Sequence, residues 1–353
     1  MQRRRTEGVP DSEAAATLPE LVQLEAILST APPELGIDTA CEVRVGRHRL
    51  PVPVIRLGST SPDSPAIAFV GGVHGLERIG SALVLECLRQ IVRRLPWDDS
   101  LHHLLEGLRI VFVPICNPGG MWLGTRANPG GVDLMRNAPI ESGERVPFLV
   151  GGQRISPALP WYRGRSGQGM EIEARALCRT IREELLTRRF SLVLDCHSGF
   201  GIRDRIWFPF ACSREPIPHL AEMHALKGLL DEVHCHHDYI VEPQSRQYLT
   251  HGDLWDYTYV ASLDHADRVF LPLTLEMGSW LWVKKNPRQL LSREGIFNPV
   301  ARHRLRRVMR RHLGLMDFLL RAVGSHRRWL PRRDGRESLR AAAVDQWYAD
   351  GRR

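Results

Sequence analysis

Two histidines and two glutamates of this 353-residue chain stand where predicted strands end, and their side chains suit metal chemistry. His74 and Glu77 lie three residues apart in GGVHGLE, and His197 directly follows the apolar run SLVLDC much later in the chain. Two imidazoles and one carboxylate form a ligand set of catalytic zinc, which keeps a fourth position open. Glu276 ends another apolar run and could act as the general base toward a water molecule activated by the metal. The pattern predicts a hydrolytic zinc centre.

The segments that must position these side chains alternate between strand-like and helix-like patterns. Two short strands are expected within 41–58, and four runs are apolar throughout, as strands buried on both faces are: 66–72, 108–115, 190–196 and 269–276. Helical spacing occurs at 18–28, 78–95, 171–189, 219–234 and 304–323. We therefore predict an α/β fold, a single domain with a central mixed, mostly parallel sheet flanked by helices. Ligands of such sheets bind beyond the carboxyl ends of the strands, so the candidate side chains should meet at one edge.

The composition indicates a folded protein that works inside the cell. Hydrophobic residues make up 43% and charged residues 25% of the chain, which is ordinary for a globular protein and argues against a disordered one. The longest apolar runs are too short to cross a bilayer, and the first residues lack the apolar region of a secretory signal. The seven cysteines include no C-x-x-C pair. We expect a cytoplasmic protein with reduced thiols and no membrane contact.

Basic residues give the chain a net charge of +8 and concentrate at 302–312 and 326–340. Because no nucleic-acid-binding motif accompanies them, we interpret them as a solvated helix face and a basic tail, although contact with nucleic acid stays open. HCHHD, at 234–238, has no paired metal-ligand spacing and is interpreted as a helix end and loop. The oligomeric state is not indicated.

We divide the chain into three parts on these patterns. They are a flexible N-terminal tail at 1–16, a catalytic domain at 17–324 and a basic C-terminal appendage at 325–353.

The candidate residues stand in motifs that resemble those of the zinc carboxypeptidases, a family of metallopeptidases. In family order, these motifs are GGVHGLE, NPGGMWLGTRANPGGVDLMRN, DCHSGFG, YLTHGDLWDYTY and LTLEMG, which span roughly 66–280. The resemblance implies the fold of that family and one Zn²⁺ per chain. It also implies His74, Glu77 and His197 as the zinc ligands and Glu276 as the general base and proton shuttle.

Four further roles follow from the resemblance. Arg126 would polarise the scissile carbonyl and stabilise the oxyanion. Arg136, with Asn137 beside it, would bind a substrate carboxylate, for which a guanidinium is well shaped. Asp133 would accept a hydrogen bond from a zinc-ligating histidine and fix its tautomer. Tyr248 would close over the substrate and donate its phenol proton as a hydrogen bond.

Three positions depart from the family pattern. Met135 stands where the family usually has Asn before the carboxylate-binding Arg, and Leu76 stands where digestive members have Arg. Trp255 stands where the resemblance implies a residue of the side-chain pocket, and its bulk would fill part of that pocket. These changes favour a small or unusual substrate: a short peptide, a cell-wall peptide or an N-acyl amino acid.

The sequence thus predicts a zinc metallopeptidase that cleaves a peptide or amide bond next to a carboxylate-bearing residue. One alternative is an N-acyl amino acid amidohydrolase of the aspartoacylase and succinylglutamate desuccinylase type. The Tyr248 segment before a Glu-bearing strand, and a final helix in place of a small β-domain, favour the peptidase. The other alternative is a non-catalytic binding protein on the same scaffold, against which the intact ligand set with Glu276 argues.

Overall fold

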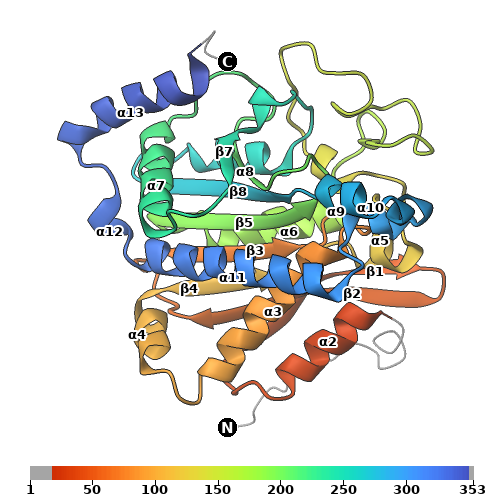
Figure 1. The fold of residues 1–353 in the computed structure, drawn as a ribbon, viewed down its shortest axis with the longest axis horizontal. Coiled ribbons are helices and arrows are strands. Elements are labelled where there is room, and N and C mark those ends of the chain that lie inside the picture. The colour runs from red at the N-terminus through yellow and green to blue at the C-terminus, as the bar shows by residue number, and fades with distance from the viewer. Residues whose placement is uncertain (1–17, 350–353) are drawn as a thin grey trace.

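One mixed sheet of eight strands forms the centre of residues 18–349, which the computed structural model describes (Figure 1). The strands are β1 (Gly36–Val45), β2 (His48–Gly58), β3 (Ala66–Gly71), β4 (Arg109–Val113), β5 (Phe190–Ser198), β6 (Arg205–Phe208), β7 (Ile240–Pro243) and β8 (Val269–Met277). Their order is β1-β2-β4-β3-β5-β8-β6-β7. Pairs β3–β4, β3–β5, β5–β8 and β6–β7 are parallel, and the other three are antiparallel. This architecture confirms the predicted α/β domain.

Helices cover both faces of the sheet. In Figure 1, α3 (Arg78–Arg94) and α11 (Arg302–Gly324) lie in front of the sheet and contact β3 and β5. Behind it lie α6 (Ile172–Glu184), which contacts β1, and α8 (Leu254–Ser262), which contacts β8. The remaining helices are α2 (Pro19–Leu28), α4 (Asp99–Gly107), α5 (Pro118–Leu123), α7 (Leu220–Val233), α9 (Trp280–Lys285), α10 (Arg293–Phe297), α12 (His326–Trp329) and α13 (Arg333–Tyr348). Three short 3-10 helices, η1 (Leu134–Arg136), η2 (Gln244–Arg246) and η3 (Pro287–Leu291), complete the described elements.

The central strands are buried on both faces, which explains why their sequences are apolar without alternation. All residues of β3 and β5 are buried. The parallel register places Gly71 opposite Cys196 and His197 opposite Glu276. The carboxyl ends of β3, β5 and β8 therefore lie together, as the sequence predicts.

The sequence predicted the long central strands and five of the helices, but it missed the 16-residue helix α13 and several short elements. The structure adds the four-residue strands β6 and β7, and α6 ends at Glu184 rather than at residue 189. HCHHD lies in the turn that follows α7, which confirms its interpretation as a helix end and loop.

The tail expected at 1–16 lies outside the described residues, but most of the segment expected as an appendage, 325–353, is described. It forms α12 and α13, and α13 packs along α7 (Figure 1). Trp347 of α13 is buried, and its indole N–H donates to the carbonyl oxygen of Val241 in β7 over 2.8 Å. Whether the domain folds without this segment stays a prediction for a truncation experiment.

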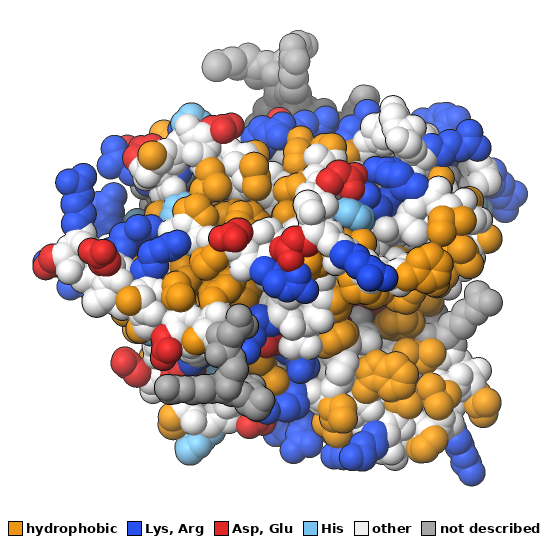
Figure 2. Space-filling view, turned by 90° about the horizontal axis from the view of Figure 1, so that it is seen from above, with side chains coloured by type: hydrophobic (Ala, Val, Ile, Leu, Met, Phe, Trp, Pro, Cys, Tyr) orange, Lys and Arg blue, Asp and Glu red, His pale blue; other side chains and the backbone are white. Residues whose placement is uncertain are grey.

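Many of the basic side chains of the protein lie on its surface. In Figure 2, Lys and Arg side chains are spread over the face, both along its outline and in its middle, with hydrophobic patches between them. All seven cysteines have free thiols. Within residues 18–349, none of the helices combines the length and the apolar character needed to traverse a bilayer.

Candidate active site

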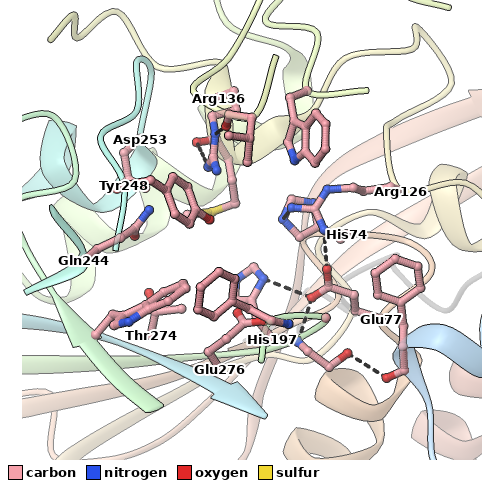
Figure 3. A pocket seen from close by; sticks show the side chains of 18 of the residues that line it. His74, Glu77, Arg126, Arg136, His197, Gln244, Tyr248, Asp253, Thr274 and Glu276 are labelled. Carbon is pink, nitrogen blue, oxygen red and sulfur yellow. Dashed lines mark hydrogen bonds and ion pairs between the residues drawn. The ribbon is translucent and has the colours of Figure 1, made fainter. Parts of the chain in front are cut away.

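The three predicted metal ligands come together at the ends of β3 and β5 (Figure 3). His74 lies in the turn after β3, Glu77 is the N-cap residue of α3, and His197 belongs to β5. All three are buried, and one ligand atom from each lies within 4.8 Å of the others. Among residues 18–349 no other group of three such side chains has this geometry. The spacing in the sequence therefore predicted a real cluster.

Glycines allow the backbone to bring these ligands together. A Cβ atom at Gly75, between the first two ligands, would lie 2.2 Å from the carbonyl carbon of Gly120. A Cβ atom at Gly80 of α3 would lie 2.1 Å from the carbonyl oxygen of Cys196, next to His197. Because both contacts are with backbone atoms, a larger residue at Gly75 would push the turn away from α5, and one at Gly80 would push α3 away from β5.

The electrostatics of the cluster fit a cation. The guanidinium of Arg126 donates to Oε1 of Glu77 over 2.5 Å and lies 2.7 Å from Nε2 of His74. Burial and the charge of Arg126 hold the pKa of His74 well below its ordinary value, so its imidazole is neutral. The neutral imidazole of His74 and the carboxylate of Glu77 are ligand types that zinc takes in catalytic sites, and a metal ion would compete with a proton for the imidazole of His197. The residues present thus fit the metal that the sequence predicts.

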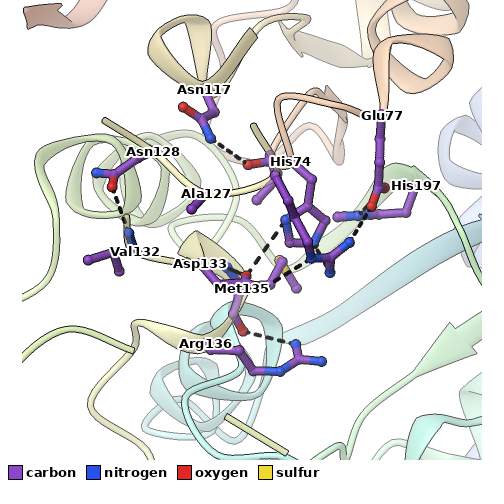
Figure 4. Close-up of polar contacts among 12 residues, drawn as sticks. His74, Glu77, Asn117, Ala127, Asn128, Val132, Asp133, Met135, Arg136 and His197 are labelled. Carbon is purple, nitrogen blue, oxygen red and sulfur yellow. Dashed lines mark hydrogen bonds and ion pairs between the residues drawn. The ribbon is translucent and has the colours of Figure 1, made fainter. Parts of the chain in front are cut away.

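Asp133 lies on the opposite side of His74 from Glu77 (Figure 4). Its Oδ1 is 3.6 Å from Nδ1 of His74, and that nitrogen is buried without a hydrogen-bond partner. Asp133 also accepts hydrogen bonds from the backbone N–H of Met135 and from Nε of Arg126. The carboxylate can therefore orient His74 and leave Nε2 for a metal, the role that the resemblance implies.

A second carboxylate, which sequence reasoning missed, contacts the other histidine. Oδ2 of Asp195 lies 2.5 Å from Nε2 of His197 and also accepts a hydrogen bond from Nε1 of Trp255 over 2.9 Å. Burial alone would lower the pKa of His197, but the carboxylates of Asp195 and Glu77 raise it well above its ordinary value. The Asp-x-His spacing within one strand was the available signal, because residues two apart share a face.

The contact with Asp195 corrects the expectation for Trp255. We expected this side chain in the substrate pocket, but it is only 3% exposed and lies in the core, outside the cavity lining. Its position on the first turn of α8 directs the indole toward β5. Trp255 therefore contacts the carboxylate beside His197 rather than the cavity.

Glu276 lies beside the cluster as the register partner of His197. Its Oε1 accepts a hydrogen bond from the backbone N–H of Phe200 over 2.9 Å. Burial, together with the nearby carboxylate of Glu77, raises the pKa of Glu276 to about 8. A carboxyl group with a raised pKa in a cavity is suited to take up and release a proton.

These side chains face one cavity of about 230 Å³. Seven of the predicted residues line it: His74, Glu77, Arg126, Arg136, His197, Tyr248 and Glu276. Figure 3 shows Arg136, Tyr248 and Asp253 along one side and the metal-ligand cluster along the other. Burial raises the pKa of Tyr248, so its phenol stays protonated and can donate a hydrogen bond.

Asn137 does not line this cavity, which corrects its expected role in substrate binding. Its side-chain nitrogen donates to the carbonyl oxygen of Arg163, and its side-chain oxygen accepts from the backbone N–H of Glu171. The side-chain amide of Asn137 thus links the segments that contain Arg163 and Glu171. Met135 does line the cavity next to Arg136, so an apolar side chain replaces the amide at that point.

Comparison with known proteins gives the family of the chain. A family model described as zinc carboxypeptidase matches residues 46–278. Carboxypeptidase B of Rattus norvegicus is 27% identical over 190 residues, which cover 51% of this chain and 44% of that protein. Murein peptide amidase A of Escherichia coli is 31% identical over 140 residues, 38% of this chain and 52% of that protein. The chain thus spans about half the length of these curated relatives.

Solved structures share the fold at low sequence identity. Thrombin activatable fibrinolysis inhibitor matches with a TM-score of 0.66 and 17% identity, over 87% of this chain and 74% of that one. Carboxypeptidase A from Helicoverpa armigera matches with a TM-score of 0.64 and 16% identity, over 87% and 73%. Because the family model covers most of the sequence and includes the cluster, the chain belongs to the zinc carboxypeptidase family.

Proposed function

We propose that this protein is a zinc-dependent hydrolase that cleaves a peptide or amide bond next to a residue with a free carboxylate. One arrangement carries the proposal: the cluster of His74, Glu77 and His197 shares a cavity with Glu276 and Arg136. The cluster and Glu276 suit metal-assisted attack by water, and a guanidinium suits a carboxylate. Membership of the zinc carboxypeptidase family supports this combination.

Zinc held by the cluster would act as a Lewis acid and lower the pKa of a water molecule to about 7. Glu276 would accept a proton from the attacking water and later donate it to the leaving amine. Burial next to Glu77 supports this shuttle, since it raises the pKa of Glu276 to about 8 and so favours proton uptake.

Arg126 would stabilise the negative charge that develops on the carbonyl oxygen. Its guanidinium is a quarter exposed and already lies at the centre of the cluster, in contact with Glu77 and Asp133. A dication among the same ligands would repel the guanidinium toward the cavity, where it can donate to the substrate. Donors of this kind contribute about 10²- to 10³-fold in kcat.

Arg136 would position the substrate through its carboxylate. The side chain is buried, and its hydrogen bonds to the carbonyl oxygens of Val150 and Met135 are long, at 3.4 Å each. A carboxylate in the cavity would form shorter, charge-assisted hydrogen bonds with the same donors. Tyr248, on the same side of the cavity, would close over the bound substrate and donate a hydrogen bond to it.

The amide of a cell-wall peptide is a second candidate for the scissile bond. The match to a relative named murein peptide amidase A favours it. An N-acyl amino acid remains an alternative substrate because it presents the same carboxylate and amide. One zinc per chain and a cytoplasmic location are part of the proposal, and the seven free thiols support the location.

A substrate screen tests the proposal. The zinc-loaded protein is incubated with short peptides, murein-derived peptides and N-acyl amino acids, with Glu276→Gln as the control, and released amines are quantified. We expect hydrolysis of at least one class by the unchanged protein and none above background by the variant. Hydrolysis by both proteins alike, or by neither, would contradict the proposed function.

A further inference from the structure

The segment that follows the catalytic strand β8 covers one side of the cavity. We call residues 279–298 the covering segment; it contains α9, η3 and α10 and lies beyond the residues matched by the family model. Trp280, Ile296 and Phe297 from this segment line the cavity. The covering segment therefore bounds the space around the metal-ligand cluster.

Asn298 attaches this segment to the turn that carries Glu77. Its side-chain oxygen accepts from the backbone N–H of Ile79 over 2.9 Å, and its side-chain nitrogen donates to the carbonyl oxygen of Leu76 over 2.8 Å. The first of these satisfies an N–H in the first turn of α3, which has no partner within the helix. One amide thus holds both flanks of a metal ligand.

The segment is also attached to the end of β5. The hydroxyl of Ser198 donates to the carbonyl oxygen of Phe297 over 2.8 Å, and Nε1 of Trp280 donates to the carbonyl oxygen of Gly199 over 3.0 Å. Gly199 has a φ of 124°, and a Cβ atom there would lie 2.9 Å from the Phe297 ring. The glycine lets this ring lie against the strand that carries His197.

Internal hydrogen bonds fix the shape of the segment. The amide nitrogen of Gln289 donates to the carbonyl oxygens of Gly295 and Asn298 over 2.7 and 3.1 Å. Arg304 of α11 donates to the side-chain oxygen of Gln289 and to the carbonyl oxygen of Trp282, over 2.9 Å each. These hydrogen bonds hold the covering segment in one conformation, so that it forms a fixed wall of the cavity. We refer to it below as the wall.

The position of this wall relative to Arg136 determines which part of a substrate meets it. Figure 3 shows Arg136 and Glu77 on opposite sides of the pocket. The contacts of Asn298 and Phe297 place the wall on the side of Glu77. A substrate whose carboxylate binds Arg136 would therefore direct its acyl part, beyond the scissile bond, toward the wall. The cavity of about 230 Å³ is also below the roughly 300–1,000 Å³ of typical ligand pockets.

We infer that the covering segment restricts the acyl side of the scissile bond to about one residue or a small acyl group. The substrates would be dipeptides or N-acyl amino acids, and longer peptides would be excluded by Phe297 and Ile296. This inference rests on the proposed function, because the orientation of the substrate follows from Arg136.

A length series tests the inference. N-acetylated peptides of two, four and six residues, which share their last two residues with the best substrate of the screen, are compared by kcat/KM. We expect at least tenfold preference of the unchanged protein for the shortest peptide. Phe297→Ala should reduce that preference at least fivefold, and Ile296→Ala is a second variant if the first one does not fold. Leu291→Ala, on the same segment but 90% exposed, is the matched control and should change nothing.

A binding measurement separates this inference from the proposed function. Acetohydroxamic acid and the hydroxamic acid of N-acetyl-trialanine both chelate zinc, and their affinities for the zinc-loaded protein are compared by calorimetry. We expect the small compound to bind more tightly than the large one, and Phe297→Ala to remove this difference in affinity. This result would support the restriction by the covering segment even if no peptide is cleaved. In that case the proposed function alone would be wrong. Equal cleavage of all lengths, equal binding of both compounds, or no difference between Phe297→Ala and Leu291→Ala would overturn the inference.

Discussion

The indole N–H of Trp255 donates a hydrogen bond to Oδ2 of Asp195 over 2.9 Å. The same carboxylate oxygen lies 2.5 Å from Nε2 of His197, and Nδ1 of His197 faces Glu77 at 3.2 Å. Since all of these side chains are buried, water does not compete for the contacts. The chain of contacts fixes the orientation of the His197 ring and leaves Nδ1 for the metal.

We expect Asp195→Asn to weaken zinc binding by about 10- to 100-fold, the usual effect of removing such a partner. Trp255→Phe should act in the same direction but less strongly, because Asp195 keeps its contact with His197. The measurement is a competition titration of the metal-free protein with a chromophoric zinc chelator. Glu222→Gln is the control, since Glu222 is a buried carboxylate of α7 that pairs with Arg336 of α13. Equal zinc affinity in Asp195→Asn and the control would show that Asp195 contributes to packing only.

The pKa of Glu276 gives a pH dependence. Burial and the Glu77 carboxylate raise this pKa from 4.5 to about 8, and a bound dication would lower it again. Because the ionised form accepts the proton, kcat/KM should rise with pH, with the midpoint of its acid limb between 4.5 and 8. A profile from pH 4 to 9 checks this expectation. In Glu276→Gln we expect kcat to fall about 10²- to 10⁴-fold with zinc still bound; a flat profile, or an active variant, would assign the base to another residue.

Arg136→Ala should lower kcat/KM about 10- to 100-fold for substrates with a free carboxylate. Charge-assisted hydrogen bonds contribute about 1.5–3 kcal/mol, and their loss should appear mainly in KM. Matched peptides with an amidated end are the control, since they offer no carboxylate to bind. If free-acid and amidated peptides respond equally to the substitution, Arg136 does not recognise the carboxylate.

The packing of α3 against β5 can be tested by a pair of helical glycines. Gly80→Ala places a Cβ atom 2.1 Å from the carbonyl oxygen of Cys196, whereas Gly228→Ala in α7 meets nothing within 4 Å. Urea unfolding should show a loss of about 1–3 kcal/mol for the first variant. The second should gain up to about 1 kcal/mol from helix propensity. Similar stabilities of the two variants would mean that α3 does not depend on this close approach.

The sequence predicted the long central strands and the cluster of His74, Glu77 and His197 for the same physical reason. Strands β3, β5 and β8 are buried on both faces, so their apolar runs are unambiguous, and their parallel arrangement places their carboxyl ends at one edge. His74, Glu77, His197 and Glu276 follow from that geometry. The general fold and the cluster could therefore be predicted from the sequence alone.

The other features of the site depend on contacts between segments that are distant in the sequence, and such contacts leave no periodic pattern in it. Trp255 was expected in a pocket, and only the packing of α8 on the sheet reveals that its indole meets Asp195. The resemblance implied that Asn137 binds substrate together with Arg136, but its hydrogen bonds with Arg163 and Glu171 are made across a loop of irregular structure. The covering segment has short helices held by side-chain amides, which hydrophobic spacing cannot predict.

Zinc analysis of the purified protein tests the central claim most directly. After incubation with zinc and dialysis, mass spectrometry of the unchanged protein should give one zinc per chain. His74→Ala, Glu77→Ala and His197→Ala should each give far less while their circular dichroism remains that of a folded protein. A zinc-free unchanged protein, or full zinc content in all three variants, would contradict the account.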